Sequence, residues 1–84
     1  MFIHESGSIG NPTIIFLHGN GANWSVWKTH MDRLDDYHCL APDFPGYGQS
    51  NDQEWISINE TTNEIAEIIR DRGLNGQAHI VGLS

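Results

Sequence analysis

The last three residues, Gly82-Leu83-Ser84, have the types and spacing to place a reactive serine at the end of a strand. They follow the apolar stretch 78–81, and Gly-x-Ser is the first half of the turn G-x-S-x-G. In that turn the glycine lets the backbone pass closely, so that the serine hydroxyl stands clear of the sheet edge. Taken alone, Gly-x-Ser is more readily interpreted as an ordinary strand end, because this spacing often occurs by chance.

A second stretch, His18-Gly19-Asn20-Gly21, follows another short apolar run and precedes a helical pattern. A loop in this position can aim backbone N–H groups at an oxygen that becomes negative during acyl transfer. The backbone N–H of Asn20 is our candidate for such a donor. For His18 the position favours a structural role, in which the ring ties down the loop, over a role as general base.

The same glycines allow a different interpretation, a dinucleotide-binding unit. Gly19-x-Gly21 begins the pattern G-x-G-x-x-G, and Asp43 follows at about the distance of a ribose-binding acid. The third glycine would be residue 24, which is a tryptophan. An indole there would prevent the close packing of helix against strand, so we weigh this alternative as the weaker one.

The elements that must position these residues follow one another as strand-helix-strand-helix-strand. We expect strands at about 13–18, 37–42 and 78–83, and a further edge strand within 2–5. The run at 13–18 is apolar without alternation, which is typical of a strand covered on both faces. Such an order predicts an α/β fold with a mostly parallel sheet joined by crossover helices.

The two expected helices carry different signals. The first has apolar residues at helical spacing after a possible N-cap at Asn23, namely Trp24, Trp27, Met31 and Leu34. The second begins with the capping box Ser57-x-x-Glu60 and ends with basic residues before Gly73. Its apolar stripe is expected to comprise Ile58, Thr62, Ile65, Ile68 and Ile69.

Composition narrows the class of protein. The 84 residues suffice for one small domain, and their net charge of −7 argues against partners such as nucleic acid or an anionic membrane surface. The single cysteine, Cys39, permits neither an intrachain disulfide nor a multi-cysteine metal site, and we expect it to pack in the second strand. No leader or membrane segment is apparent, so a cytoplasmic location is the default, and we expect no cofactor and no metal.

A third stretch completes a pattern. Residues 43–50 read Asp-Phe-Pro-Gly-Tyr-Gly-Gln-Ser, which fits every fixed position of the motif D-x-P-G-x-G-x-S. With the two earlier stretches, in the same order and spacing, the chain resembles the N-terminal part of the α/β-hydrolase superfamily from about Thr13 onward. The resemblance implies a partial α/β-hydrolase domain over 1–84, interrupted within its nucleophile turn. It also implies that the 13–18 strand lies between the other two.

The resemblance further implies a serine hydrolase of the esterase kind. Ser84 would be the nucleophile and the Asn20 N–H one oxyanion donor, whereas the second donor and the triad acid and histidine would follow residue 84. We expect no histidine of this chain to substitute, with His30 and His38 on the surface. A serine disfavours the dehalogenase and epoxide-hydrolase branches, which use aspartate. The substrate would be a small acyl compound, and the alternative is a non-catalytic scaffold fragment.

Overall fold

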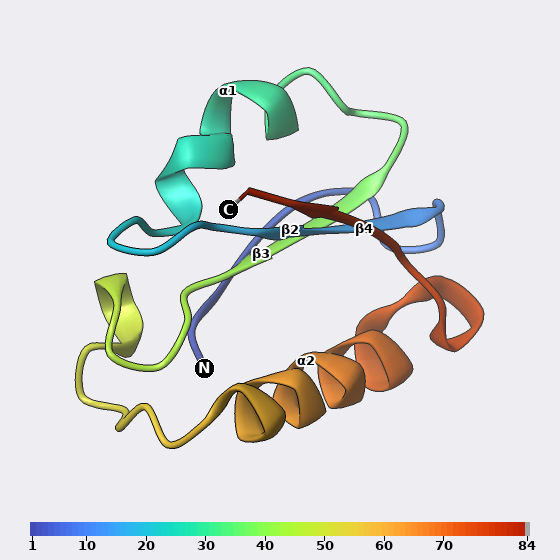
Figure 1. Ribbon diagram of the computed structural model, residues 1–84. Helices are drawn as coiled ribbons and strands as arrows, with labels where there is room; N and C mark the ends of the chain where they lie inside the picture. The colour runs from blue at the N-terminus through green and yellow to red at the C-terminus, as the bar shows by residue number, and fades with distance from the viewer. Residues whose placement is uncertain (84) are drawn as a thin grey trace.

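A twisted four-stranded sheet forms the middle layer of the computed structural model, which describes residues 1–83. The strands are β1 (Ile3–Gly7), β2 (Thr13–Leu17), β3 (His38–Pro42) and β4 (His79–Gly82). Helix α1 (Lys28–Met31) lies over one face of the sheet and helix α2 (Ile58–Arg72) over the other (Figure 1). This layering confirms the predicted α/β class.

The order of the strands in the sheet is β1-β3-β2-β4. Strand β2 runs parallel to both neighbours, with Ile14 opposite Cys39 on one side and His79 on the other. The prediction that the strand at 13–18 lies between the other two is confirmed, and each strand ends within one residue of its expected bounds. Strand β1 pairs antiparallel with β3 at the edge, as expected of residues 2–5.

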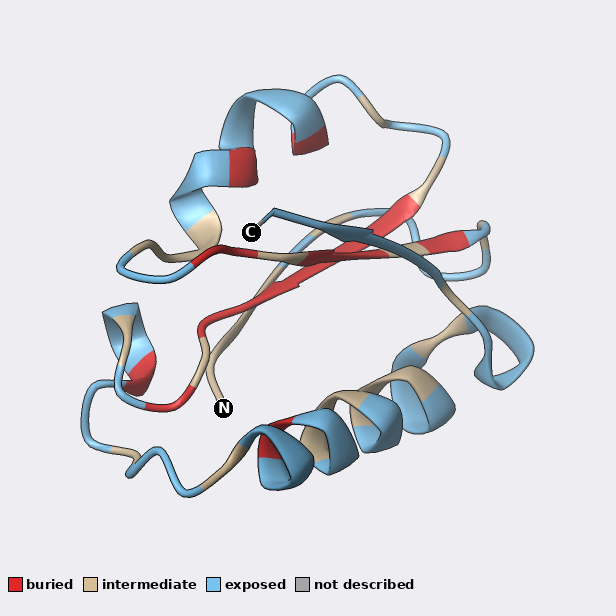
Figure 2. Cartoon of the chain, in the orientation of Figure 1, coloured by how far each residue is buried: buried red, intermediate tan, exposed pale blue. Residues whose placement is uncertain are grey.

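The core is built around β3, all five of whose residues are buried. Figure 2 shows the buried residues concentrated in β2 and β3, whereas β4 is exposed along its length. On the α1 side the core cluster consists of Phe16, Trp27, Met31, Cys39 and Ala41. Cys39 is fully buried there as predicted, and burial raises the pKa of its thiol.

The first helix is shorter than the spacing of apolar residues from Trp24 to Leu34 predicts. It opens with a 3-10 turn over Trp24–Trp27, where the Asn23 side chain accepts a hydrogen bond from the Ser25 N–H, as expected of an N-cap. After α1 the chain continues in turns, with hydrogen bonds from Arg33 and Leu34 to carbonyls three residues earlier. Leu34 still packs against the core, so the apolar spacing is satisfied without a continuous helix.

Helix α2 begins and ends as predicted, but its buried face is shifted. The Ser57 hydroxyl accepts a hydrogen bond from the Glu60 N–H, and Gly73 follows the last turn. Thr61 is the buried residue, whereas Ile58 and Thr62 are exposed, contrary to the expected stripe. Here Thr61 lines a hollow together with Pro45, Gln53, Glu54 and Ile56, so the first turn of α2 lies beside the segment that follows β3. Farther along, Ile65, Ile68 and Ile69 are half-buried.

None of the helices within residues 1–83 is both long enough and apolar enough to cross a membrane.

Candidate active site

The three motif-bearing stretches meet at the carboxyl end of the parallel strands. The loop 18–23 follows β2, the loop 43–50 follows β3, and a hydrogen bond of 3.1 Å from the Leu83 N–H to the Leu17 carbonyl holds the end of β4 beside β2. In open α/β sheets this edge is where ligands bind. Ser84, the predicted nucleophile, lies outside the described residues.

His18 is a structural residue of this edge. Its ring is buried, its Nδ1–H donates to the Gly19 carbonyl at 2.8 Å, and its Nε2 accepts from the Phe44 N–H at 3.0 Å. The ring also packs against the side chains of Phe44 and Tyr47. Because both ring nitrogens are engaged, His18 joins the two loops and does not offer a base, in agreement with the role expected of it.

Asp43 joins the same loops through its carboxylate. It is completely buried and accepts hydrogen bonds from the Trp24 N–H at 2.7 Å and the Gln49 N–H at 2.8 Å. Both carboxylate oxygens therefore accept hydrogen bonds from backbone N–H groups. The carboxylate is not directed to a ribose, as the dinucleotide interpretation would require. Gly48 adopts a φ of +51°, and a Cβ on it would collide with the Asp43 carboxylate. The motif residues Asp43 and Gly48 thus depend on each other.

Ser50 closes the motif by binding the N-terminus of the chain. Its buried hydroxyl donates to the Asp43 carbonyl at 2.8 Å and accepts from the Phe2 N–H at 2.8 Å. The Asp43 N–H donates in turn to the Phe2 carbonyl at 2.8 Å. The loop after β3 is therefore anchored to the segment that leads into β1.

Asn20 lies exposed in the loop after β2, where the Gly21 backbone has a φ of +77°. Its side-chain oxygen accepts a hydrogen bond of 2.6 Å from the Tyr47 hydroxyl. Within residues 1–83 no group accepts a hydrogen bond from the Asn20 backbone N–H. This N–H therefore has no hydrogen-bond partner among the described residues, and its predicted role as an oxyanion donor stays a prediction.

A hollow of 680 Å³ opens beside Asn20. Its other lining residues come from the loop after β3 and the segment leading to α2, and they are Phe44, Pro45, Gly46, Tyr47 and Trp55. Ligand pockets usually have this character, mostly apolar with a few placed polar groups. The sequence interpretation did not include these aromatic residues, because Phe44 and Tyr47 occupy variable positions of the motif and Trp55 lies outside it.

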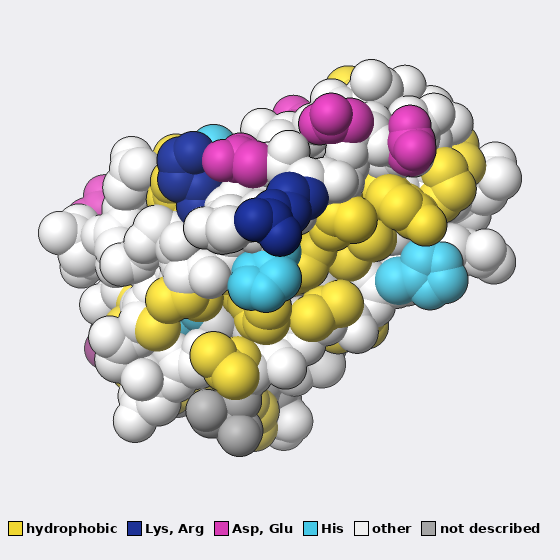
Figure 3. Space-filling model, turned by 90° about the horizontal axis from the view of Figure 1, so that it is seen from above, with side chains coloured by type: hydrophobic (Ala, Val, Ile, Leu, Met, Phe, Trp, Pro, Cys, Tyr) yellow, Lys and Arg dark blue, Asp and Glu magenta, His cyan; other side chains and the backbone are white. Residues whose placement is uncertain are grey.

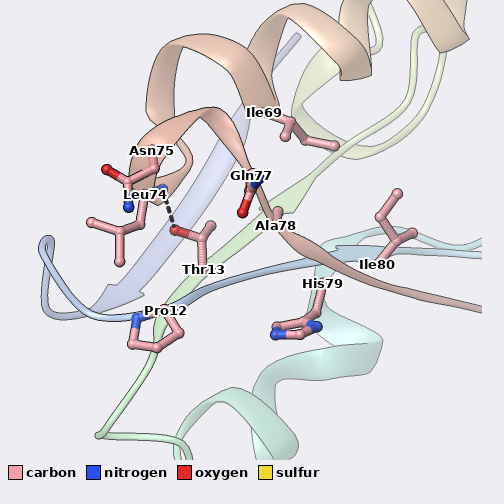
Figure 4. Close-up of a pocket in the computed structure, with 9 residues that line it drawn as sticks. All are labelled: Pro12, Thr13, Ile69, Leu74, Asn75, Gln77, Ala78, His79 and Ile80. Atoms are coloured by element: carbon pink, nitrogen blue, oxygen red, sulfur yellow. Dashed lines mark hydrogen bonds between the residues drawn. The ribbon is translucent and has the colours of Figure 1, made fainter.

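A second hollow, of 520 Å³, lies at the opposite, amino end of the strands (Figure 4). Thr13, His79 and the chain after α2 line it, and the Thr13 hydroxyl accepts a hydrogen bond of 2.9 Å from the Leu74 N–H. Figure 4 shows Ile69 and Ile80 on the same side of β4, forming an apolar wall. None of the described residues of the three motif stretches lines this hollow, so the candidate site remains at the carboxyl edge.

The remaining histidines lie away from that hollow beside Asn20. His4 stacks on Trp24 with ring centroids 3.7 Å apart, and His30 is exposed as predicted. The prediction of a surface position is wrong for His38, which is 2% exposed. Its strand is buried on both faces, and Glu5 supplies the hydrogen-bond partner that a buried imidazole needs. In the described part of the chain no three His, Cys, Asp or Glu side chains gather as a metal site would require.

Comparison with known families agrees with this geometry. The family model described as alpha/beta hydrolase fold matches residues 12–84. The chain belongs to the α/β-hydrolase family. An AB hydrolase superfamily protein of Gibberella zeae is 33% identical over 83 residues, a region that covers 96% of this chain and 29% of that protein.

Two solved hydrolase structures resemble this α/β-hydrolase chain. The epoxide hydrolase VrEH1 from Vigna radiata superposes with a TM-score of 0.78 and 30% identity, covering 95% of this chain and 27% of that one. A bacterial membrane phospholipase A superposes with a TM-score of 0.77 and 30% identity, and the match covers 98% of this chain and 27% of that one. The chain thus spans less than a third of the length of these relatives, which include hydrolases of different bonds.

Proposed function

We propose that these residues belong to a serine hydrolase that cleaves carboxylic esters or related acyl bonds of small molecules. Ser84 would attack the acyl carbonyl, and the Asn20 N–H would donate to the oxygen that becomes negative. The observation that carries the proposal is the convergence of two loops and the end of β4 at one sheet edge, where the Asn20 N–H is unengaged within residues 1–83. The activity proposed is that of a protein of the relatives' length that contains this chain.

The proposed reaction proceeds through an acyl-enzyme. The serine hydroxyl loses its proton to a general base as its oxygen bonds to the carbonyl carbon, and the leaving group departs with a proton from the same base. Water then gives a proton to the same base as it attacks the acyl-enzyme, the carboxylic acid departs, and the serine oxygen takes its proton back from the base. His18 has both ring nitrogens engaged. We therefore assign the base, and the acid that orients it, to positions after residue 84, in the order Ser, acid, His found in this family.

The serine itself favours acyl chemistry over epoxide opening. The similarity to an epoxide hydrolase extends over the whole scaffold, so it does not by itself distinguish between the reactions. The position that matches the family's nucleophile is Ser84, and a serine forms an acyl-enzyme with an ester carbonyl.

A fluorophosphonate probe, which reacts with activated serines, tests the nucleophile. We expect the full-length protein to be labelled and Ser84→Ala to abolish the labelling. Ser8→Ala is the matched control, because Ser8 is exposed in the turn before β2, and it should label normally. Labelling that survives Ser84→Ala would show that another residue is the nucleophile.

The alternative function, a non-catalytic scaffold, makes the opposite prediction for the full-length protein. The 84-residue chain alone should not be labelled in either case, because an unassisted serine is a poor nucleophile at neutral pH. Failure of the full-length protein to react with the probe or to hydrolyse any ester would favour the scaffold.

A further inference from the structure

The hollow beside Asn20 has an aromatic wall that the proposed reaction does not explain. Phe44, Tyr47 and Trp55 line it together with Pro45 and Gly46. We propose that this hollow is a subsite for a neutral ring-sized apolar group, aromatic or alicyclic, that lies within a few bonds of the reacting carbonyl. The inference rests on the proposed function, since it takes the Asn20 N–H as the donor to that carbonyl.

Two of the three aromatic side chains are held in place before any ligand arrives. Phe44 donates its N–H to His18, and its ring centroid lies 4.4 Å from that of the histidine. Tyr47 is held by its hydrogen bond to the Asn20 side chain. A preformed apolar wall costs little ordering on binding, which favours affinity for a rigid apolar group.

Trp55 is the exposed part of this wall. Its side chain is 43% exposed although tryptophan carries one of the largest apolar surfaces of any residue. It lies in the irregular segment before α2 and faces the same hollow as Tyr47. A ring placed against it would gain both from apolar burial and from aromatic stacking.

The charges around the hollow define the class of group that it accepts. None of its lining residues is charged, and no lysine or arginine occurs anywhere in residues 34–69. The neighbours of Trp55 include two acidic residues, Asp52 and Glu54. A carboxylate or phosphate on the bound group would therefore find no positive partner among the lining residues, and Glu54, adjacent in sequence to Trp55, carries a negative charge. Neutral groups are favoured.

The catalytic test compares esters with and without a ring. The full-length protein is assayed with three esters. Ethyl acetate has no ring, methyl phenylacetate carries a ring on the acyl side, and benzyl acetate carries one on the alcohol side. We expect kcat/KM for at least one ring-bearing ester to exceed that of ethyl acetate by roughly tenfold, as expected for burial of one ring. Trp55→Ala should remove most of this preference, by raising KM for the ring-bearing ester more than KM for ethyl acetate.

Ile9→Ala is the matched control, because Ile9 is 79% exposed in the turn between β1 and β2, away from the hollow. It should leave all three esters unchanged. The proposal is overturned if neither ring-bearing ester is preferred, or if Trp55→Ala affects all three esters alike.

A binding test separates this inference from the reaction. In the Ser84→Ala variant of the full-length protein, calorimetric titration compares neutral phenylacetamide with its 4-carboxy derivative, which carries the negative charge on the ring and not at the Asn20 N–H. We expect the neutral amide to bind at least fivefold more tightly than the charged derivative, and Trp55→Ala to weaken binding of the neutral amide at least fivefold. If no ester is hydrolysed but this pattern holds, the proposed reaction is wrong and the subsite stands. Equal binding of the two, or none, would overturn the subsite.

Discussion

At the scale of single residues, the motif D-x-P-G-x-G-x-S is explained by hydrogen bonds of the loop and not by reactivity. Asp43 uses both carboxylate oxygens on backbone N–H groups, and Ser50 links the Asp43 carbonyl to Phe2. Such buried networks are costly when any member is left unpaired. These residues therefore hold the loop beside Asn20 in one shape.

Gly48 provides a direct test of that network. We expect Gly48→Ala to destabilise the full-length protein by about 2–3 kcal/mol, because alanine is strained at a positive φ and its Cβ would displace the Asp43 carboxylate. Urea denaturation measures the change. Gly10→Ala is the matched control, since Gly10 also has a positive φ but its Cβ would meet open space. A loss no larger than that of the control would show that Asp43 does not restrict residue 48.

At the scale of elements, a chain of polar contacts joins β1, β2, β3 and the end of α2. The His38 imidazole donates to the Glu5 carboxylate, which also binds Arg72 at 2.9 Å. The Thr13 hydroxyl lies 3.5 Å from the other nitrogen of His38 and accepts the Leu74 N–H at 2.9 Å. The hydrogen bond from His38 lowers the pKa of Glu5 below its ordinary value of 4.5, Arg72 lowers it further, and burial opposes both.

This lowered pKa predicts a dependence of stability on pH. A carboxyl whose pKa is lower in the folded state stabilises the fold above its ordinary pKa, and loses that contribution as the pH falls through the lowered value. We expect Glu5→Gln to cost about 1 kcal/mol at neutral pH, a modest amount because the side chain is 34% exposed. The difference in free energy of unfolding between the wild type and Glu5→Gln should become smaller below pH 4.5.

Denaturant titrations across this pH range measure this difference, with Glu67→Gln on the exposed face of α2 as the control. A difference that stays constant with pH would exclude the proposed contribution of the Glu5 carboxylate.

Elements were predictable from the sequence where apolar runs and caps coincide. The strands, the caps at Asn23 and Ser57 and the order around β2 follow from local signals together with the family resemblance. The errors arise where tertiary contacts decide. Thr61 is buried because the first turn of α2 lies beside the segment that follows β3, and the interior position of His38 depends on Glu5, a residue distant in sequence.

The candidate site was predictable to a similar depth. The placement of His18 and Asn20 in the loop after β2 was expected from the motif. The role of Asn20 as an oxyanion donor stays a prediction. The bond between Tyr47 and Asn20 was not predictable, since it joins side chains of two separate loops. The role of Trp55 likewise depends on where an irregular segment passes.

At the scale of the whole molecule, the edge of the sheet formed by β4 is uncovered in the part of the chain that the structure describes. Strand β4 pairs with β2 alone among the described strands, and all four of its residues are exposed. Figure 3, which looks onto the face that carries α1, shows apolar side chains exposed in a band across this surface. Ile80 is 60% exposed and Leu83 is 55% exposed, and no charged residue occurs from 78 to 83 except for the histidine at 79.

An apolar edge strand without charged residues pairs readily with other chains. We therefore expect the isolated 84-residue chain to self-associate, and Ile80→Lys to shift it toward monomer, because a lysine on an edge strand opposes pairing. Sedimentation velocity measures the distribution of species. Ile9→Lys is the control, since it adds the same charge at an exposed position outside β4 and should leave the association largely unchanged. A monomeric chain that melts cooperatively would contradict the prediction, and equal effects of the two lysines would indicate that net charge, and not the β4 edge, governs the association.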